Sequence, residues 1–171
     1  MTPATTTLSP SLAPPATLSL AALAAVTRDL ADRPDLWRRL VQFDRGERWW
    51  TRLEGPPGTD VWLLSWLRSQ GTELHDHGES GAAFTVVVGT LTETRPDPQG
   101  RLVPLKLRVG QAQTVEPGAI HDVVNDHAEP AVSIHAYSPR LERMTYYTRA
   151  AGRITATHTV LTHEPEQEPG R

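Results

Sequence analysis

The chain has 171 residues and a formal net charge of −3, and a single domain of this length can bury a core without a disulfide or structural metal. No cysteine is present, which excludes a disulfide framework, a thiolate metal site and a cysteine nucleophile. The slightly acidic balance gives no general attraction for nucleic acid or anionic lipid, and no run approaches the roughly 18 apolar residues of a membrane span, so we expect a soluble protein with a small-molecule partner.

The N-terminal arm, residues 1–16, consists mainly of Thr, Pro, Ser and Ala with little to bury, and we expect it to be disordered. The domain is expected to span residues 17–161. A short apolar stretch from Leu18 to Val26 resembles a signal core, but no basic residue precedes it and it continues as an amphipathic pattern. We therefore expect a cytoplasmic protein.

Two helices are predicted at the start of the domain. Apolar residues recur at spacings of three and four in the first, and the second follows start signals around Pro34. The first apolar face comprises Leu20, Leu23, Val26 and Leu30, and the second comprises Leu36, Trp37, Leu40, Val41 and Phe43. We expect both helices to cover one side of a sheet.

From Arg48 to Tyr147 the hydrophobic period is two, which predicts short strands separated by Gly, Pro, Asp and Asn turns. The predicted strands span residues 48–54, 60–67, 83–88, 91–95, 102–109, 113–116, 122–125, 131–137 and 143–148, with a candidate edge strand at 153–161. Such a series is typical of an all-β jelly roll or a related barrel, whose mouth can enclose a small ligand. The tail, residues 162–171, is rich in Glu and Pro and is expected to be solvated.

A metal site is predicted at His75 and His77. Histidines at i and i+2 of an extended strand point to the same face and can chelate one ion. The flanking segments 61–67 and 84–88 read as buried strands, which place the pair on a rigid sheet. A polar turn between two strands is the alternative interpretation of this stretch.

His121 is the third candidate ligand. It follows a Pro-Gly turn at the start of a strand far along the chain, and a two-sheet barrel can bring it beside the first two histidines. Three neutral imidazoles leave open positions on a divalent metal ion, as in catalytic sites, whereas structural metals usually have four protein ligands.

A row of polar side chains is predicted on one later strand. Ser133, His135 and Tyr137 stand at i, i+2 and i+4, so they share a strand face. A hydroxyl, an imidazole and a phenol in line can form a hydrogen-bonded relay that holds the tyrosine hydroxyl toward the metal. A half-exposed strand with a polar outer face is the alternative interpretation.

The two histidine stretches resemble the paired motifs of the cupin superfamily, His-x-His followed later by Gly-x-x-His-x-x-x-Asn. Gly118, His121 and Asn125 match the second motif. Ala82 stands where many cupins carry a glutamate ligand, so that carboxylate is missing, and Glu79 is retained as a backup ligand. The resemblance implies a cupin-type double-stranded β-helix with the two helices at its N-terminus.

The ordered motifs between residues 48 and 147 resemble the bacterial branch of the cysteine dioxygenase family. The motifs that carry the resemblance are Arg48-Trp49-Trp50-Thr51-Arg52-Leu53, Val61-Trp62-Leu63-Leu64-Ser65-Trp66, His75-Asp76-His77-Gly78 and Ser133-x-His135-x-Tyr137-Ser138-Pro139. The resemblance implies a ferrous enzyme that adds both atoms of O2 to the sulfur of L-cysteine and forms cysteine sulfinate.

The resemblance also implies the role of each site residue. His75, His77 and His121 would bind Fe(II), Arg52 would pair with the substrate carboxylate, and Ser133, His135 and Tyr137 would form the catalytic triad, with Tyr137 also contacting substrate. The Ser138–Pro139 bond would be cis, which X-Pro bonds permit.

Two positions depart from the family pattern, and one of the histidines needs a hydrogen-bond partner to orient its ring. Ala82 replaces the cysteine that animal enzymes link to the active-site tyrosine, so Tyr137 must be held by hydrogen bonds alone. Trp50 stands where the family motif has a tyrosine near the arginine. We expect Asp122 or Asn125 to orient His121 through its second ring nitrogen.

Alternatives to a cysteine dioxygenase remain open. A relative that oxidises 3-mercaptopropionate shares the histidines and the triad, although Arg52 accompanies cysteine in the family and glutamine accompanies the other acid. A non-catalytic cupin would hold a ligand or metal without consuming O2. A zinc hydrolase also uses three histidines, but no glutamate base is visible in the motif. Cupins include monomers and dimers, and we expect a monomer.

Overall fold

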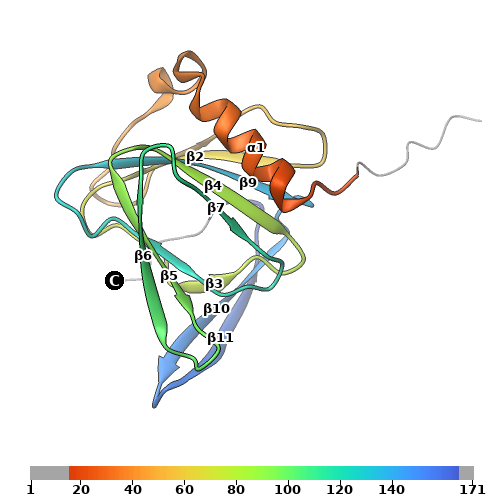
Figure 1. Cartoon of the computed structure of the whole chain (residues 1–171), viewed down its shortest axis with the longest axis vertical. Coiled ribbons are helices and arrows are strands. Elements are labelled where there is room, and N and C mark those ends of the chain that lie inside the picture. Colours follow the sequence, from red (N-terminus) through yellow and green to blue (C-terminus); the bar gives the residue numbers. More distant parts are fainter. Residues whose placement is uncertain (1–15, 166–171) are drawn as a thin grey trace, which may run out of the picture.

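The computed structural model describes residues 16–165 of the chain. The arm predicted for residues 1–16 lies outside this range except for Ala16, as do residues 166–171 of the predicted tail. One helix packs on the outside of a body built from antiparallel strands (Figure 1). No helix in the described range is long and apolar enough to cross a bilayer.

The helical segments all precede the strands. Helix α1 spans Leu20–Ala31, and two 3-10 turns, η1 and η2, span Pro34–Leu36 and Arg38–Leu40. Ser19 begins α1 because its hydroxyl accepts a hydrogen bond from the Ala22 N–H at 3.2 Å, which satisfies one of the unpaired donors of the first turn.

The second predicted helix is wrong, because residues 34–40 form only the two 3-10 turns and Val41 is already extended. Short helices are stabilised mainly by the packing of an apolar face. Leu36 and Leu40 remain 39% and 41% exposed, so this segment has no such face. Trp37 is the buried residue of the segment, and its indole N–H donates to the Leu30 carbonyl.

Eleven strands follow within the described range. Strands β1 to β11 span Trp50–Arg52, Asp60–Trp66, Leu74–Asp76, Gly81–Val88, Thr90–Pro96, Leu102–Arg108, Ala112–Val115, Asp122–Val124, Ala131–Ser138, Arg143–Ala150 and Arg153–Leu161. They form a five-stranded sheet in the order β1-β2-β9-β4-β7 and two three-stranded sheets, β11-β10-β3 and β6-β5-β8. The three sheets do not join into one closed sheet, and the predicted edge strand is present as β11.

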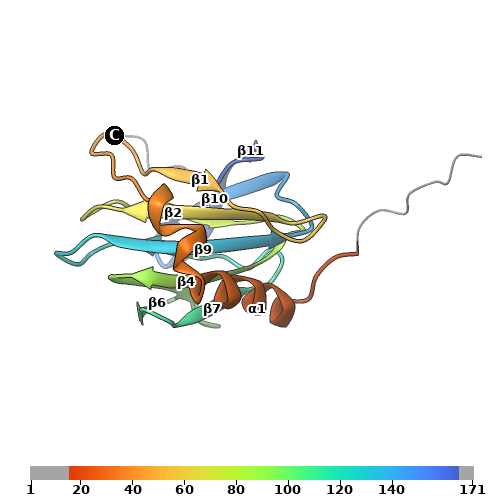
Figure 2. The ribbon, with the colours of Figure 1, turned by 90° about the horizontal axis from the view of Figure 1, so that it is seen from above.

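The five-stranded sheet separates two apolar layers. Figure 2 shows α1 lying across β4, β7 and β9, whereas the smaller sheets lie on the other side of the large sheet (Figure 1). Side chains of β2 alternate between the layers: Val61 and Leu63 pack toward α1, and Trp62, Leu64 and Trp66 pack into the interior between the sheets. The interior layer surrounds the functional site.

The first residues of the predicted tail form hydrogen bonds with the body, although His163 and Glu164 are exposed. The Thr162 N–H donates to the Glu142 carbonyl at 3.0 Å, and a ring nitrogen of His163 donates to the Leu141 carbonyl at 3.0 Å. Pro165 is buried. These contacts hold residues 162–165 beside the loop between β9 and β10.

Candidate metal centre

Three buried histidines meet in the interior of the fold. The Nε2 atom of His77 lies 3.1 Å from that of His75 and 3.5 Å from that of His121. One ligand atom from each residue lies within 4.8 Å of the others, and the three residues are at most 2% exposed. Nitrogens roughly 2 Å from one ion and at right angles lie about 3 Å apart, so this donor set fits a metal ion.

The backbone brings His75 and His121 together across a gap of 46 positions. The two residues form an isolated antiparallel bridge, in which each N–H donates to the other's carbonyl at 2.9 and 3.0 Å. Gly118 has φ +71°, a left-handed conformation that favours glycine and turns the chain just before His121. His77 stands two positions after His75 and therefore shares its face.

Hydrogen bonds orient two of the rings. The Nδ1–H of His75 donates to the Glu73 carbonyl at 2.8 Å, and the Nδ1–H of His121 donates to Oε1 of Glu93 at 2.8 Å. A neutral imidazole with its proton on Nδ1 presents an unprotonated Nε2, which is the form that binds a metal. Both rings therefore direct a lone pair toward the shared point.

Glu93 is the partner of His121 that the sequence did not indicate. Its side chain is 1% exposed and also accepts a hydrogen bond from Arg95 at 2.7 Å. Burial raises the pKa of the Glu93 carboxyl above its ordinary value, and the hydrogen bond and charge of Arg95 oppose this rise. Glu93 stands two positions after the buried Leu91 on the same strand, so the two side chains share the inward face. This spacing is the sequence signal that could have identified Glu93.

The predicted partners of His121 are engaged elsewhere, so that prediction is wrong. Asn125 is fully buried, and its amide donates to the carbonyls of Trp66 and Glu129 at 3.0 and 2.9 Å. Asp122 forms its hydrogen bond with Thr94. Adjacent residues of a strand point to opposite faces, so Asp122 projects away from the face that His121 occupies.

The predicted polar row is present on β9. Ser133 Oγ lies 2.9 Å from His135 Nε2, and Tyr137 Oη lies 3.4 Å from His135 Nδ1. The row runs to the metal centre, because the Tyr137 ring packs edge-on against His77 with ring centroids 4.9 Å apart. Phe84 stacks on His135 at 4.9 Å and limits its rotation.

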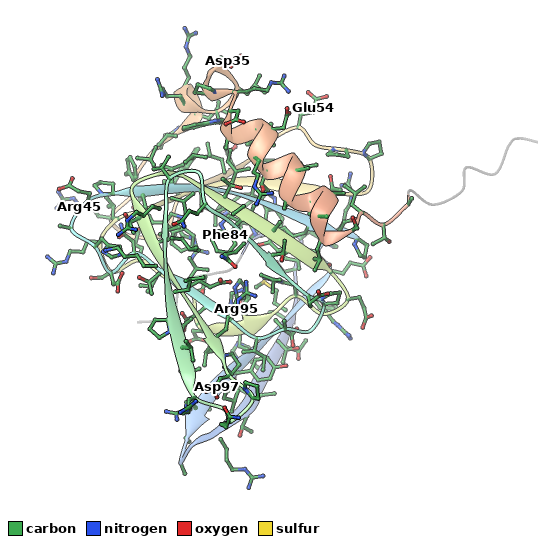
Figure 3. The ribbon with its side chains drawn as sticks, in the orientation of Figure 1. Asp35, Arg45, Glu54, Phe84, Arg95 and Asp97 are labelled. Carbon is green, nitrogen blue, oxygen red and sulfur yellow. The ribbon has the colours of Figure 1, made fainter. Side chains whose placement is uncertain are left out.

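Two of these neighbours can be followed in Figure 3. Phe84 and Arg95 both lie toward the middle of the molecule, whereas Asp35 and Asp97 lie toward its opposite ends. Arg95 thus brings its positive charge inward to Glu93, and Phe84 covers the relay. The centre is enclosed by the sheets and is not a feature of an exposed loop.

Arg52 is an exposed residue of β1, with its side chain 47% exposed. It pairs in register with Trp62, and its guanidinium carbon is 5.6 Å from the centre of that ring. Trp62 in turn contacts Tyr137, with ring centroids 4.9 Å apart. The Arg52 Nη1 donates to Asp60 at 2.7 Å and Nη2 donates to the His163 carbonyl, so the protein itself engages both terminal nitrogens.

Ala82 stands where many cupins have a glutamate ligand and where animal enzymes of the family have a cysteine, and Glu79 is the predicted backup for that ligand. Glu79 is 85% exposed and pairs with Arg143 at 3.2 Å, so it is not a backup ligand. Ala82 pairs directly with Tyr137 between β4 and β9. Its side chain is a methyl group, which cannot form a covalent link to the phenol. The Ser138–Pro139 bond is cis, as predicted.

A cavity of about 460 Å³ lies on the outside of the metal centre. It is lined by His77, Glu79, Ser80, Pro139, Arg140, Glu142, Arg143 and Leu161. Because His77 is part of the lining, this cavity lies next to the histidine cluster, although His77 itself is buried. Within residues 16–165, that cluster is the one group of His, Cys, Asp and Glu side chains arranged to hold a metal ion.

Solved structures of similar fold identify the architecture. A conserved protein with a double-stranded β-helix domain from Klebsiella pneumoniae aligns with a TM-score of 0.52 at 16% identity, over 71% of this chain and 93% of its own. A cupin superfamily protein from Desulfitobacterium hafniense aligns with a TM-score of 0.51 at 11% identity, over 60% and 87% of the two chains. The fold is the predicted cupin type.

Sequence relatives are more specific. Cysteine dioxygenase type 1 of Danio rerio is 30% identical over 134 residues, which are 70% of this chain and 65% of the relative. The Rattus norvegicus protein of the same name is 29% identical over 139 residues, 75% and 69% of the two chains. The chain thus spans about two thirds of the length of these relatives. The family model for cysteine dioxygenase type I matches residues 16–150, and this chain belongs to that family.

Proposed function

We propose that this protein is an Fe(II)-dependent thiol dioxygenase that converts L-cysteine and O2 to cysteine sulfinate. The observation that carries the proposal is the buried three-histidine cluster, with the Ser133-His135-Tyr137 row ending beside it. Membership of the cysteine dioxygenase type I family supports the reaction class. The reaction is balanced by itself: both oxygen atoms bond to sulfur, the thiol is oxidised to a sulfinate, and O2 is the oxidant.

His75, His77 and His121 would hold the ferrous ion. Imidazole nitrogens suit iron, and a three-ligand face leaves positions for substrate, as in other non-heme iron oxygenases. When bound, iron would supply the redox chemistry that joins a thiolate to O2. Residues other than these three histidines would recognise and orient the substrate.

Arg52 would bind the substrate carboxylate through its planar fork of donors. The guanidinium stacks beside Trp62, which leads to Tyr137 and His77 through successive ring contacts. An acid group at this edge would therefore orient a small thiol toward the cluster. Asp60 already accepts one of the five N–H donors of Arg52, so a substrate carboxylate would share the guanidinium with it.

Tyr137 would contact the bound substrate and hold a proton at its hydroxyl. Its ring is fully buried between Trp62 and His77, and His135 adjoins its oxygen. No cysteine exists to link to it, so these contacts alone would fix the phenol. The same packing excludes water from the interior side of the cluster.

The test is oxygen uptake by protein purified without O2, assayed for its metal and then loaded with Fe(II). We expect consumption of O2 with L-cysteine, formation of cysteine sulfinate, and a preference for L-cysteine over 3-mercaptopropionate. The variant Arg52→Gln should reverse that preference, because an amide lacks the charge and the fork that match a carboxylate.

Each alternative gives a different result in the same assay. A wild-type preference for 3-mercaptopropionate would overturn the substrate assignment. Iron-loaded protein that consumes no O2 with either thiol would indicate a cupin that only binds metal. Hydrolase activity with zinc is disfavoured, since Glu93 is engaged by His121 and Arg95 and is not placed as a base.

A further inference from the structure

The polar row on β9 receives one more hydrogen bond, from a tryptophan of the neighbouring strand. The indole N–H of Trp66, in β2, donates to Ser133 Oγ at 2.9 Å. Both side chains are fully buried. An indole nitrogen can only donate, so Ser133 must act as the acceptor in this bond.

The direction of the next bond follows from the proton of Ser133. A hydroxyl has one hydrogen to donate, and a buried hydroxyl without an acceptor is unfavourable. Within the described residues, the other polar neighbour of Ser133 Oγ is His135 Nε2, at 2.9 Å. The serine hydrogen is therefore directed to Nε2, which must be the unprotonated nitrogen of the ring.

A neutral His135 with a bare Nε2 carries its proton on Nδ1. That nitrogen faces Tyr137 Oη at 3.4 Å, so the imidazole is the donor and the phenol is the acceptor. The phenol hydrogen is consequently not directed back at His135. Tyr137 can donate it toward the side of the ring that His77 and the substrate share.

Contacts on both sides keep Trp66 in place. The Arg48 guanidinium lies 4.4 Å from the centre of the indole ring, and Arg48 is itself tied to the Gly71 carbonyl at 3.1 Å. The backbone carbonyl of Trp66 accepts from the Asn125 amide at 3.0 Å. These contacts restrict the movement of Trp66, the first donor in the series of hydrogen bonds that runs through Ser133 and His135 to Tyr137.

We propose that Trp66 is a positioning residue for the reaction. It fixes His135 in the tautomer protonated on Nδ1, and this tautomer makes Tyr137 a hydrogen-bond donor to the substrate. The consequence for turnover rests on the proposed function. The tautomer itself is a property of the polypeptide and is measurable without metal or substrate.

Long-range proton–nitrogen NMR of the ¹⁵N-labelled, metal-free full chain reads which nitrogen of His135 carries the proton. The resonance is identified by its loss in His135→Gln. We expect protonation of Nδ1 in the wild type. Trp66→Phe keeps an aromatic ring but removes the N–H, so Ser133 can reverse its hydrogen bond and His135 should become a mixture of tautomers. In the iron-loaded enzyme kcat should fall by roughly tenfold, with a smaller change in KM.

The chain offers a matched control in Trp62. It lies on the same strand and face, and its indole nitrogen has no hydrogen-bond partner within the described residues. Trp62→Phe therefore removes an N–H that fixes nothing, and the His135 tautomer should be unchanged. If Trp66→Phe does not fold, Ser133→Ala removes the link between Trp66 and His135 and should also mix the tautomers.

Two outcomes would overturn the inference: a wild-type His135 protonated on Nε2, or an Nδ1 proton that persists undiminished in Trp66→Phe or Ser133→Ala. Failure of the proposed function gives a separate signature. Iron-loaded wild type would then consume no O2 with either thiol, while the tautomer of His135 would still respond to Trp66→Phe.

Discussion

Three rings of the site, those of His75, His121 and His135, each have a hydrogen-bond partner of different chemistry. His75 donates to a main-chain carbonyl, His121 to the carboxylate of Glu93, and His135 adjoins the hydroxyl of Ser133. A carboxylate is the strongest acceptor of the three when it is ionised, and the ion pair of Glu93 with Arg95 favours that form. The His121 bond is therefore the one most sensitive to a change of partner.

The variant Glu93→Gln tests this bond. We expect metal affinity to fall by about 10–100-fold, because an amide oxygen is a weaker acceptor and raises the basicity of His121 less. Competition titration of the metal-free protein measures the change. Asp122→Asn is the control, since Asp122 bonds to Thr94 and should leave affinity unchanged. Equal affinity in Glu93→Gln and wild type would show that Glu93 does not support the ligand.

At the scale of elements, the tail segment after β11 lies against the proposed carboxylate site. The His163 carbonyl accepts from Arg52 Nη2 while Asp60 accepts from Nη1. A guanidinium has five N–H donors, so a substrate carboxylate would share the group with these two acceptors. The tail would thus compete with the substrate proposed for this site, and its bonds to Leu141 and Glu142 hold it beside Arg52.

Deletion of residues 162–171 should lower KM for L-cysteine by about two- to tenfold, with little change in kcat. The range corresponds to roughly 0.5–1.5 kcal/mol for one hydrogen bond that no longer has to be exchanged. Steady-state oxygen uptake measures both constants. Glu164→Ala retains the His163 carbonyl and should behave as wild type. A KM that rises on deletion would mean that the tail helps to hold Arg52 in its binding position.

Over the whole molecule, the histidine cluster lies where the two three-stranded sheets meet. His75 belongs to β3 of one three-stranded sheet, and His121 precedes β8 of the other. Within residues 16–165, their isolated bridge is one of two such bridges outside the named strands. A bound ion would add a further connection between the two sheets.

Metal should therefore stabilise the fold by mass action. At a free metal concentration of 100 times Kd, the free energy of unfolding should rise by about 2.7 kcal/mol. Urea unfolding of the full chain with and without Fe(II), in the absence of O2, measures this increment. His121→Ala should abolish it, whereas His127→Ala, which removes a histidine paired with Asp126 outside the cluster, should retain it. An unchanged increment in His121→Ala would exclude His121 as a ligand.

Local rules in the sequence determined most of the elements and part of the site. Period-two alternation predicted the strands, and helical spacing predicted α1, whose apolar face packs on the large sheet. The same alternation placed His75 with His77 and aligned Ser133, His135 and Tyr137 on one face. These relations depend only on the geometry of a single strand or helix, so they can be read without knowing which strands are neighbours.

Tertiary structure decided the relations between distant segments. The strand order set the bridge between His75 and His121, brought Glu93 to the second ring nitrogen of His121, and placed Trp66 beside Ser133. The segment after Pro34 formed 3-10 turns and not a helix because its leucines found no surface to cover. Such outcomes depend on packing and hydrogen bonding across long loops, which no local pattern of residues specifies.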